Sequence, residues 1–387
     1  MLRYKYRLPV SGAAFAVLIA FIYSLSSTLI MPVFPLFLKS LVNKSAYVGY
    51  FMSFIYFLVL IYILISTYFL KNNKITILKF SVFGFGITIF LLTIINSVTQ
   101  LIILEIFRTL FIAVNFVVMG LLIRDASTKK TISKNEGYYF AIINISFFIG
   151  PIIGGFLANA YTIKTVFSIA AIFPFLVFLL LFTQKGKTHN TRIEKVNLFA
   201  NIKNFFRNKN LLINYFISLG LMAWLTIIYI YLPLYMSKEG LSEKTIGLVL
   251  AFTVIPLVIL EIPVTKLTKY FGYKKLFCFG FLLIALFGIA TFFTNQIYIK
   301  LLFFILTNLG IAFVEPLKEA YFFETNKRSD EVNFYPIFKT SSDVGNLTGP
   351  LIFSTILLFT NFSIMFLVAS ILMLIFALIS LTLKETK

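Results

Sequence analysis

The chain has 387 residues, of which 60% are hydrophobic and 12% charged, and its mean hydropathy is +0.96. Soluble domains are about half apolar and about a quarter charged, so a water-soluble globule is excluded. One Cys (Cys278) and one His (His189) exclude an internal disulfide, a zinc cluster and haem ligation, and the net charge of +20 lies in loops between apolar runs, which argues against a nucleic-acid partner.

Twelve apolar stretches are long enough to cross a bilayer as helices, since a span needs about 20 residues. We number them one to twelve, at residues 12–38, 46–70, 75–95, 99–123, 138–159, 164–183, 211–236, 245–268, 274–294, 298–323, 336–359 and 362–383. The first run shows no small-residue cleavage site, which predicts a retained span. The pattern predicts an all-α protein with twelve transmembrane helices, embedded in the lipid bilayer.

Positively charged residues gather on alternate sides of these spans. The poorer set of loops holds Lys39, Lys44, Lys164, Lys238, Lys244 and Lys300, while the richer set includes both termini and the middle of the chain. Loops rich in Lys and Arg stay in the cytoplasm. We therefore expect a multi-pass protein of the cell membrane with both termini cytoplasmic, which requires an even number of spans.

The two halves of the chain resemble each other at a shift of about 198 residues. The matches pair Pro35 with Pro233, Gly49 with Gly247, Asp125 with Glu324, and Gly150-Pro151 with Gly349-Pro350. Internal repeats of this kind are typical of secondary transporters. The repeat predicts two six-helix halves, residues 1–183 and 211–387, joined by a connector at 184–210.

The connector contains a predicted amphipathic helix. Apolar residues recur at helical spacing with basic residues between them, namely Ile193, Val196, Phe199, Ile202, Phe205 and Phe206 with Lys195, Lys203 and Arg207. Such a helix is expected to lie on the cytoplasmic face of the membrane. We interpret it as a tether, with a regulatory role as the alternative.

Small residues follow a defined spacing in span five: Gly137, Ser146, Gly150-Pro151 and Gly154-Gly155. This pattern resembles the major facilitator superfamily, and within it the proton-coupled efflux branch of twelve-span antiporters, with Ser146 where the family has Gly. The resemblance implies two pseudo-symmetric six-helix bundles and efflux in exchange for protons. The alternative is plain helix packing, because small residues let backbones approach and Pro151 can kink the span.

A second resemblance lies in span four, where members of the family place an Arg within the membrane. Here the Arg is Arg108, followed by Ala113 where the family favours Gly, and Glu105 lies one turn earlier. A charge inside the bilayer costs at least about 2.5 kcal/mol, so we expect Arg108 to face a cavity and to pair with Glu105. The alternative is a structural ion pair near the outer end of the helix.

The loop that gates the cytoplasmic side in this family reads Gly-x-x-x-Asp-Arg-x-Gly-Arg after spans two and eight, and it is degraded here. The loop after span two has neither Gly nor Asp, and the one after span eight keeps Gly272 but has Lys269 where an acid is usual. This departure puts the family's gate contacts in doubt. Arg124 and Asp125 after span four could supply a substitute charge pair, and we predict them, Lys269 and Glu324 as the cytoplasmic gate charges.

Most acids within the predicted spans lie in the second half. They are Glu261 in span eight, Glu315 and Glu319 in span ten beside Lys318, and Asp343 in span eleven. We expect Lys318 to neutralise Glu319 and Glu315 to face a drier region. The alternative is that Lys318 and Glu319 lie close enough to the cytoplasm to snorkel. A carboxyl group in dry surroundings holds a proton readily and can release it when its cavity opens to water.

These observations favour a secondary transporter that works by alternating access without a bound cofactor, driven by the proton gradient. The expected partner is a small, partly apolar solute, because the spans offer aromatic side chains such as Tyr23, Phe34, Trp224, Tyr229 and Tyr231. We expect a monomer. The alternatives are proton-coupled uptake of a sugar or metabolite, a lipid flippase, and a membrane-embedded transferase, which the lack of a reactive His or a phosphate-binding loop disfavours.

Overall fold

The computed structural model describes residues 11–69, 74–125, 127, 132–183, 198–326 and 328–384. Every regular element in these ranges is helical. Within them, 11 helices are long and apolar enough to cross a membrane. The predicted all-α membrane fold is therefore confirmed, while the orientation of the termini and the count of twelve spans stay predictions.

The chain forms two compact units. Unit 1 comprises Met1–Phe37, Leu58–Arg192 and Ser242–Ala251, and unit 2 comprises Leu38–Phe57, Ile193–Leu241 and Phe252–Lys387. Each unit thus draws most of its residues from one half of the chain. Each also takes one short segment from the other half.

Unit 1 is built around α1 (Ser11–Ile30) and α4 (Lys74–Leu91). Helix α1 packs against α6 (Ile132–Ala160) and α7 (Ile163–Leu181), and α4 packs against α7 and α5 (Val98–Asp125). One buried apolar cluster joins four of these helices through Ile19, Leu78, Val82, Val118, Met119, Val177 and Leu181. The apolar faces of these helices therefore meet inside the unit as well as facing lipid.

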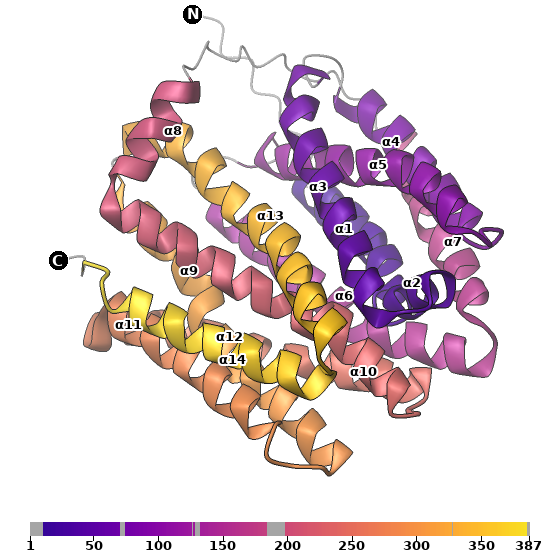
Figure 1. Ribbon diagram of the computed structural model, residues 1–387. Coiled ribbons are helices and arrows are strands. Elements are labelled where there is room, and N and C mark those ends of the chain that lie inside the picture. Colours follow the sequence, from indigo (N-terminus) through magenta and orange to yellow (C-terminus); the bar gives the residue numbers. More distant parts are fainter. Residues whose placement is uncertain are drawn as a thin grey trace, which may run out of the picture. The chain divides into compact units, whose positions relative to one another are not determined.

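Unit 2 is organised by α9 (Lys209–Thr226). This helix runs alongside α12 (Ile297–Thr325), α13 (Arg328–Phe359) and α14 (Phe362–Ser380), as Figure 1 shows. Asn208 caps the start of α9 by accepting the amides of residues 210 and 211. The N-terminal half of α3 (Ser45–Phe69) belongs to this unit as well.

The connector does contain a helix, α8 (Leu198–Arg207), which packs against α9 and α13. Its Phe205 is fully buried in a cluster with Leu211, Phe322 and Phe338, whereas Phe206 is exposed. The expectation that the apolar face lies on the membrane is wrong for Phe205, because aromatic side chains of unit 2 bury it instead. The first part of the predicted helix, residues 193–197, lies outside the described residues.

The first predicted span is broken in the structure. Helix α1 ends at Ile30 and α2 (Phe34–Val42) begins after a turn of three residues, so the single helix expected at 12–38 is wrong. Pro32 and Pro35 explain the break, because proline lacks an amide donor and crowds the preceding turn.

The seventh predicted span is distorted at the equivalent position of the repeat. Helix α9 passes into a π-helical turn, Ile227–Tyr231, before α10 (Leu232–Lys238). Pro233 lies in the first turn of α10, where its missing amide is tolerated. Since α2 starts at residue 34 and α10 at residue 232, the repeat of 198 residues is visible in the backbone itself.

Predicted spans eight and nine form one element, α11 (Glu243–Ala290), of 48 residues. At about 1.5 Å per residue a continuous helix of this length would be more than twice as long as the hydrocarbon core of a bilayer is thick. The backbone leaves helical geometry at Gly272, where φ is 73° and ψ is 165°. This glycine, retained from the family's loop pattern, therefore separates two helical segments.

Gly272→Ala is expected to destabilise the protein by about 1–3 kcal/mol, because that backbone conformation is open essentially to glycine alone. The unfolding midpoint of the purified protein in detergent measures the effect. Gly120→Ala is the matched control, since Gly120 lies in α5 with open space around it and is expected to lose no stability. Equal midpoints for the two variants would contradict the assignment of Gly272 as the break.

Candidate functional site

The small residues predicted in span five bring α6 into close contact with α1. Ser24 Oγ donates a hydrogen bond to Ser146 Oγ at 2.6 Å. A methyl group at Gly150 would collide with Thr28, and one at Gly154 with the carbonyl oxygen of Leu29. Positions four residues apart therefore form one face of α6 that meets the α1 backbone.

The second face of the same motif meets the beginning of α11, which belongs to the same unit. A Cβ atom at Gly155 would lie 2.5 Å from the carbonyl oxygen of Glu243 and 3.0 Å from the Cα of Gly247, and one at Gly247 would collide with the carbonyl oxygen of Pro151. The motif is thus a packing device on both sides. Its remaining member, Gly137, lies within the first two turns of α6.

Unit 2 contains the counterpart of this crossing. Gly49 of α3 fits against Ser354 of α13 and Tyr231, with no room for a Cβ atom. Tyr231 Oη also donates to the carbonyl oxygen of Pro350 at 2.7 Å, and Ser53 Oγ of α3 donates to Leu347 O at 2.9 Å. The glycines paired by the sequence repeat, at 49 and 247, therefore occupy matching crossings, one in each unit.

Arg108 and Glu105 form the predicted ion pair in α5. Arg108 Nε and Nη2 donate to the two carboxylate oxygens at 2.7 and 2.8 Å, and Glu105 is fully buried. The guanidinium lies over the ring of Phe34, 4.8 Å from its centroid. Because α5 runs from residue 98 to 125, the pair lies two to three turns after the start of this helix.

Polar groups extend this site along α1, α4 and α5. Ser81 Oγ donates to Asn115 Oδ1 at 2.5 Å, while Asn115 Nδ2 is buried without a hydrogen-bond partner among the described residues. Tyr23 lies beside Asn115 and within electrostatic range of Arg108. Sequence reasoning missed Asn115, although its position two turns after Arg108 puts both on one face of the helix.

The predicted pairing of Lys318 with Glu319 is wrong. Lys318 Nζ instead lies 2.9 Å from Glu315 Oε2, and the Lys318 side chain is 3% exposed while that of Glu315 is 38% exposed. Helical side chains lean toward the N-terminus, so a residue meets its neighbour three positions earlier rather than the next residue. Glu315 is therefore paired rather than held in a dry region, and Lys318 does not snorkel.

Glu319 finds its partners on α13. It accepts hydrogen bonds from Lys339 Nζ and from Tyr335 Oη, the latter at 3.2 Å. Sequence reasoning missed Lys339 because its partner, Glu319, lies on another helix. The signal available was a Lys within predicted span eleven, four residues before Asp343.

Glu261 and Asp343 are the other two acids predicted within the spans of the second half, and both belong to unit 2. Glu261 of α11 lies close enough to Glu315 for the two carboxylates to repel each other, and no ion pair forms on it among the described residues. Tyr229 is also within electrostatic range of Glu315. Asp343 lies one turn after Lys339 and interacts with it. Unit 2 thus gathers four acids and two lysines, on α11, α12 and α13.

The remaining predicted residues are placed as follows. Glu324 accepts a hydrogen bond from Tyr273 Oη at 2.6 Å, directly after the break at Gly272, and Lys269 is exposed on α11. Arg124 and Asp125 end α5, but their side chains lie outside the described residues. Their role as gate charges stays a prediction.

Three of the five aromatic residues expected around a solute are buried, and one of these is Phe34, which is 6% exposed and lies under the guanidinium of Arg108. Trp224 and Tyr231 are fully buried in the packing of unit 2. Tyr23 and Tyr229 remain partly exposed. Among the described residues no group of three His, Cys, Asp or Glu could hold a metal ion.

The family model of the Major Facilitator Superfamily matches residues 16–255 and 225–387. The chain belongs to this superfamily. It is therefore a transporter rather than an enzyme.

Individual relatives agree with this assignment. The chain is 25% identical over 341 residues to the quinolone resistance protein NorA of Staphylococcus aureus, covering 86% of both chains. It is 26% identical over 197 residues to an uncharacterized MFS-type transporter of Methanocaldococcus jannaschii, a match that spans 49% of this chain and 50% of that protein.

Solved structures show the same fold at lower identity. A POT family transporter in complex with 5-aminolevulinic acid has a TM-score of 0.82 at 10% identity, covering 96% of this chain and 95% of that one. The nucleoside transporter NupG has a TM-score of 0.75 at 10% identity, covering 96% and 98%.

Glu105→Gln is expected to destabilise the protein by about 3 kcal/mol, because Arg108 keeps its charge in a buried position without a counter-ion. The unfolding midpoint measures this, with the exposed Glu239→Gln as control. Adding Arg108→Met to Glu105→Gln should restore most of the loss. A midpoint for Glu105→Gln equal to that of the control would contradict the pairing.

Proposed function

We propose that the protein exports a small, partly apolar solute in exchange for protons, by alternating access across the cell membrane, with twelve crossings and cytoplasmic termini. The observation that carries this proposal is the acidic cluster of unit 2. It occurs in a chain that is similar, over 86% of its length, to a quinolone resistance protein. The small-residue motif of α6 supports the same branch of the superfamily.

Glu261 is the group we assign as the proton carrier. It is half-buried, it faces a second carboxylate, and no cation is paired with it among the described residues. Protonation of a carboxylate in this position is favourable, because it removes both the repulsion from Glu315 and the free-energy cost of a partly buried charge.

Glu315 couples that proton to the rest of the cluster. It is bound to Lys318, which is almost fully buried and therefore depends on Glu315 for its charge balance. Loss of a proton from Glu261 places two negative charges beside one ammonium, and gain of a proton leaves a balanced pair. Glu319, held by Lys339 and Tyr335, keeps its own partner in both states.

The test reconstitutes the purified protein in liposomes, imposes a pH gradient, and follows a fluorescent quinolone and a panel of small aromatic solutes. We expect solute movement against proton flow. Glu261→Gln should reduce it about tenfold or more, because a proton-binding group inside the membrane is lost. Glu315→Gln should have a comparable effect.

Glu319→Gln is the matched control, one residue away from Lys318 on the same helix and expected to retain most exchange. Since Glu315→Gln leaves Lys318 without its partner, each variant is first compared with the wild type for its unfolding midpoint. Wild-type exchange in all three variants would remove the proposed roles of the carboxylates. Solute movement in the direction of the protons would instead identify an uptake symporter, and lipid movement alone a flippase.

A further inference from the structure

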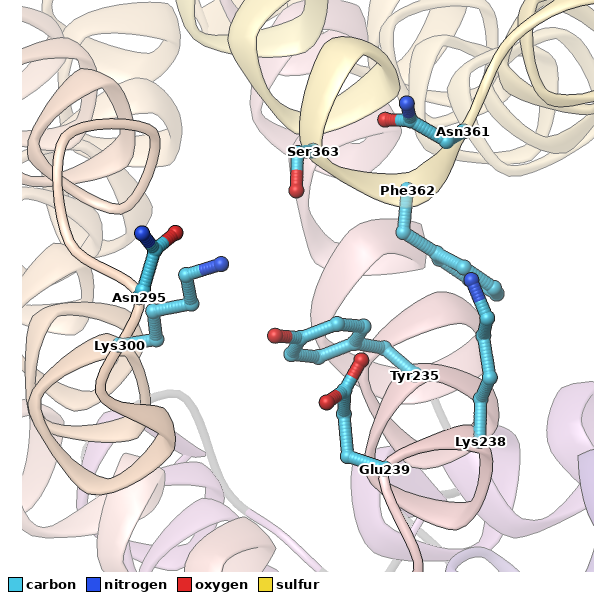
Figure 2. A pocket seen from close by; sticks show the side chains of 8 residues that line it. All are labelled: Tyr235, Lys238, Glu239, Asn295, Lys300, Asn361, Phe362 and Ser363. Atoms are coloured by element: carbon cyan, nitrogen blue, oxygen red, sulfur yellow. The ribbon is translucent and has the colours of Figure 1, made fainter.

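A cavity lies in unit 2, away from the acidic cluster. It encloses about 340 Å³ and is lined by residues at the end of α10, before and in α12, and at the start of α14. Figure 2 shows the lining side chains, which are Tyr235, Lys238, Glu239, Asn295, Lys300, Asn361, Phe362 and Ser363. These elements meet at the end of the unit that we predict to face outside the cell.

Lys300 is the unusual residue of this cavity. It is only 8% exposed, and its ammonium lies 5.7 Å from the centroid of the Tyr235 ring. Among the described residues no acceptor or carboxylate takes part in a hydrogen bond or ion pair with this ammonium. Figure 2 shows the side chain directed into the space between Tyr235 and Ser363. A buried ammonium of this kind lacks the acceptors that it had in water.

Two helix N-termini border the same space. Helix α12 has 29 residues and starts after Gln296, whose side chain makes no capping hydrogen bond. Helix α14 has 19 residues and starts after Asn361, whose side chain accepts only the amide of Ile364. The first amides of a helix have no acceptor within the helix, and its N-terminal end carries a partial positive charge. Both helices therefore add to the positive field around Lys300.

The charge balance of the lining is positive. Lys300 and Lys238 contribute two positive charges and Glu239 one negative charge. Lys238 lies over the ring of Phe362 at 5.6 Å, and Glu239 is exposed at the end of α10 beside Tyr235. The Glu239 carboxylate is exposed and screened by solvent, whereas Lys300 is 8% exposed and lines the cavity. An anion is therefore the ligand that the interior of this cavity lacks.

We propose that this cavity binds a small oxyanion, a phosphate or carboxylate group, through the Lys300 ammonium and the N-terminal ends of α12 and α14. The group belongs either to a free anion or to the headgroup of an anionic lipid. Its binding ties the ends of α10, α12 and α14 together and stabilises unit 2. This site is separate from the acidic cluster and does not depend on the identity of the transported solute.

The test uses the full-length protein in nanodiscs of neutral phosphatidylcholine. Its unfolding is followed through the fluorescence of Trp224, the single Trp of the chain, which is fully buried in unit 2. Sodium phosphate is titrated against sodium chloride of equal ionic strength. We expect phosphate to raise the unfolding midpoint of the wild type by about 2 °C or more, as a ligand specific for the folded state does.

Lys300→Met should abolish this rise or weaken the apparent phosphate affinity about tenfold or more, since a charge-assisted contact is lost. Lys164→Met is the matched control, because Lys164 also lies near a helix start but donates to Asn96 Oδ1 in unit 1 at 3.3 Å, and it should respond as the wild type does. Lys300→Arg keeps the charge and should keep the response, which distinguishes lost binding from lost folding.

A second arm replaces part of the neutral lipid with phosphatidylglycerol and omits phosphate. If phosphatidylglycerol stabilises the wild type but not Lys300→Met, the site is supported and the bound oxyanion is a lipid headgroup. If inorganic phosphate stabilises the wild type but not Lys300→Met, the site is supported and the bound oxyanion is a free anion. The proposal is overturned if neither probe raises the wild-type midpoint, or if Lys300→Met responds as strongly as the wild type.

Discussion

A charge that is buried among apolar helices needs a partner, and this constraint shapes both units. Glu105 and Arg108 satisfy each other within one helix, through two short hydrogen bonds. Lys318 takes Glu315, and Glu319 takes Lys339 from the neighbouring helix. Glu261, which lacks such a partner among the described residues, and Lys300 stand out against this background. They carry the two proposals because the surrounding structure leaves their charges unbalanced.

Close approach of backbones is the second organising feature. Small residues on two faces of α6 admit α1 on one side and the start of α11 on the other. The same arrangement recurs where Gly49 of α3 meets α13. In physical terms the small-residue motif of α6 includes positions, at Gly150, Gly154 and Gly155, where even a methyl group would separate two helices.

The sequence allowed the fold class, the repeat and the Glu105–Arg108 pair to be predicted, because each depends on local spacing or on hydropathy. It failed where the decisive partner was distant or where two local rules competed. Lys339 lies on another helix than Glu319, and the choice of Lys318 between Glu315 and Glu319 depends on the direction in which helical side chains lean. The broken first span was within reach, since Pro32 and Pro35 stand in its sequence, but hydropathy alone conceals such breaks.

The exchange of short segments between the units bears on how the chain assembles. Residues 38–57 are made with the first half of the chain but pack in unit 2, and residues 242–251 follow the connector but pack in unit 1. During synthesis unit 1 therefore stays incomplete until the polypeptide has grown well past its middle. A nick in the connector would leave two fragments that each hold a segment needed by the other, so they should be recovered together when co-expressed and poorly when expressed apart.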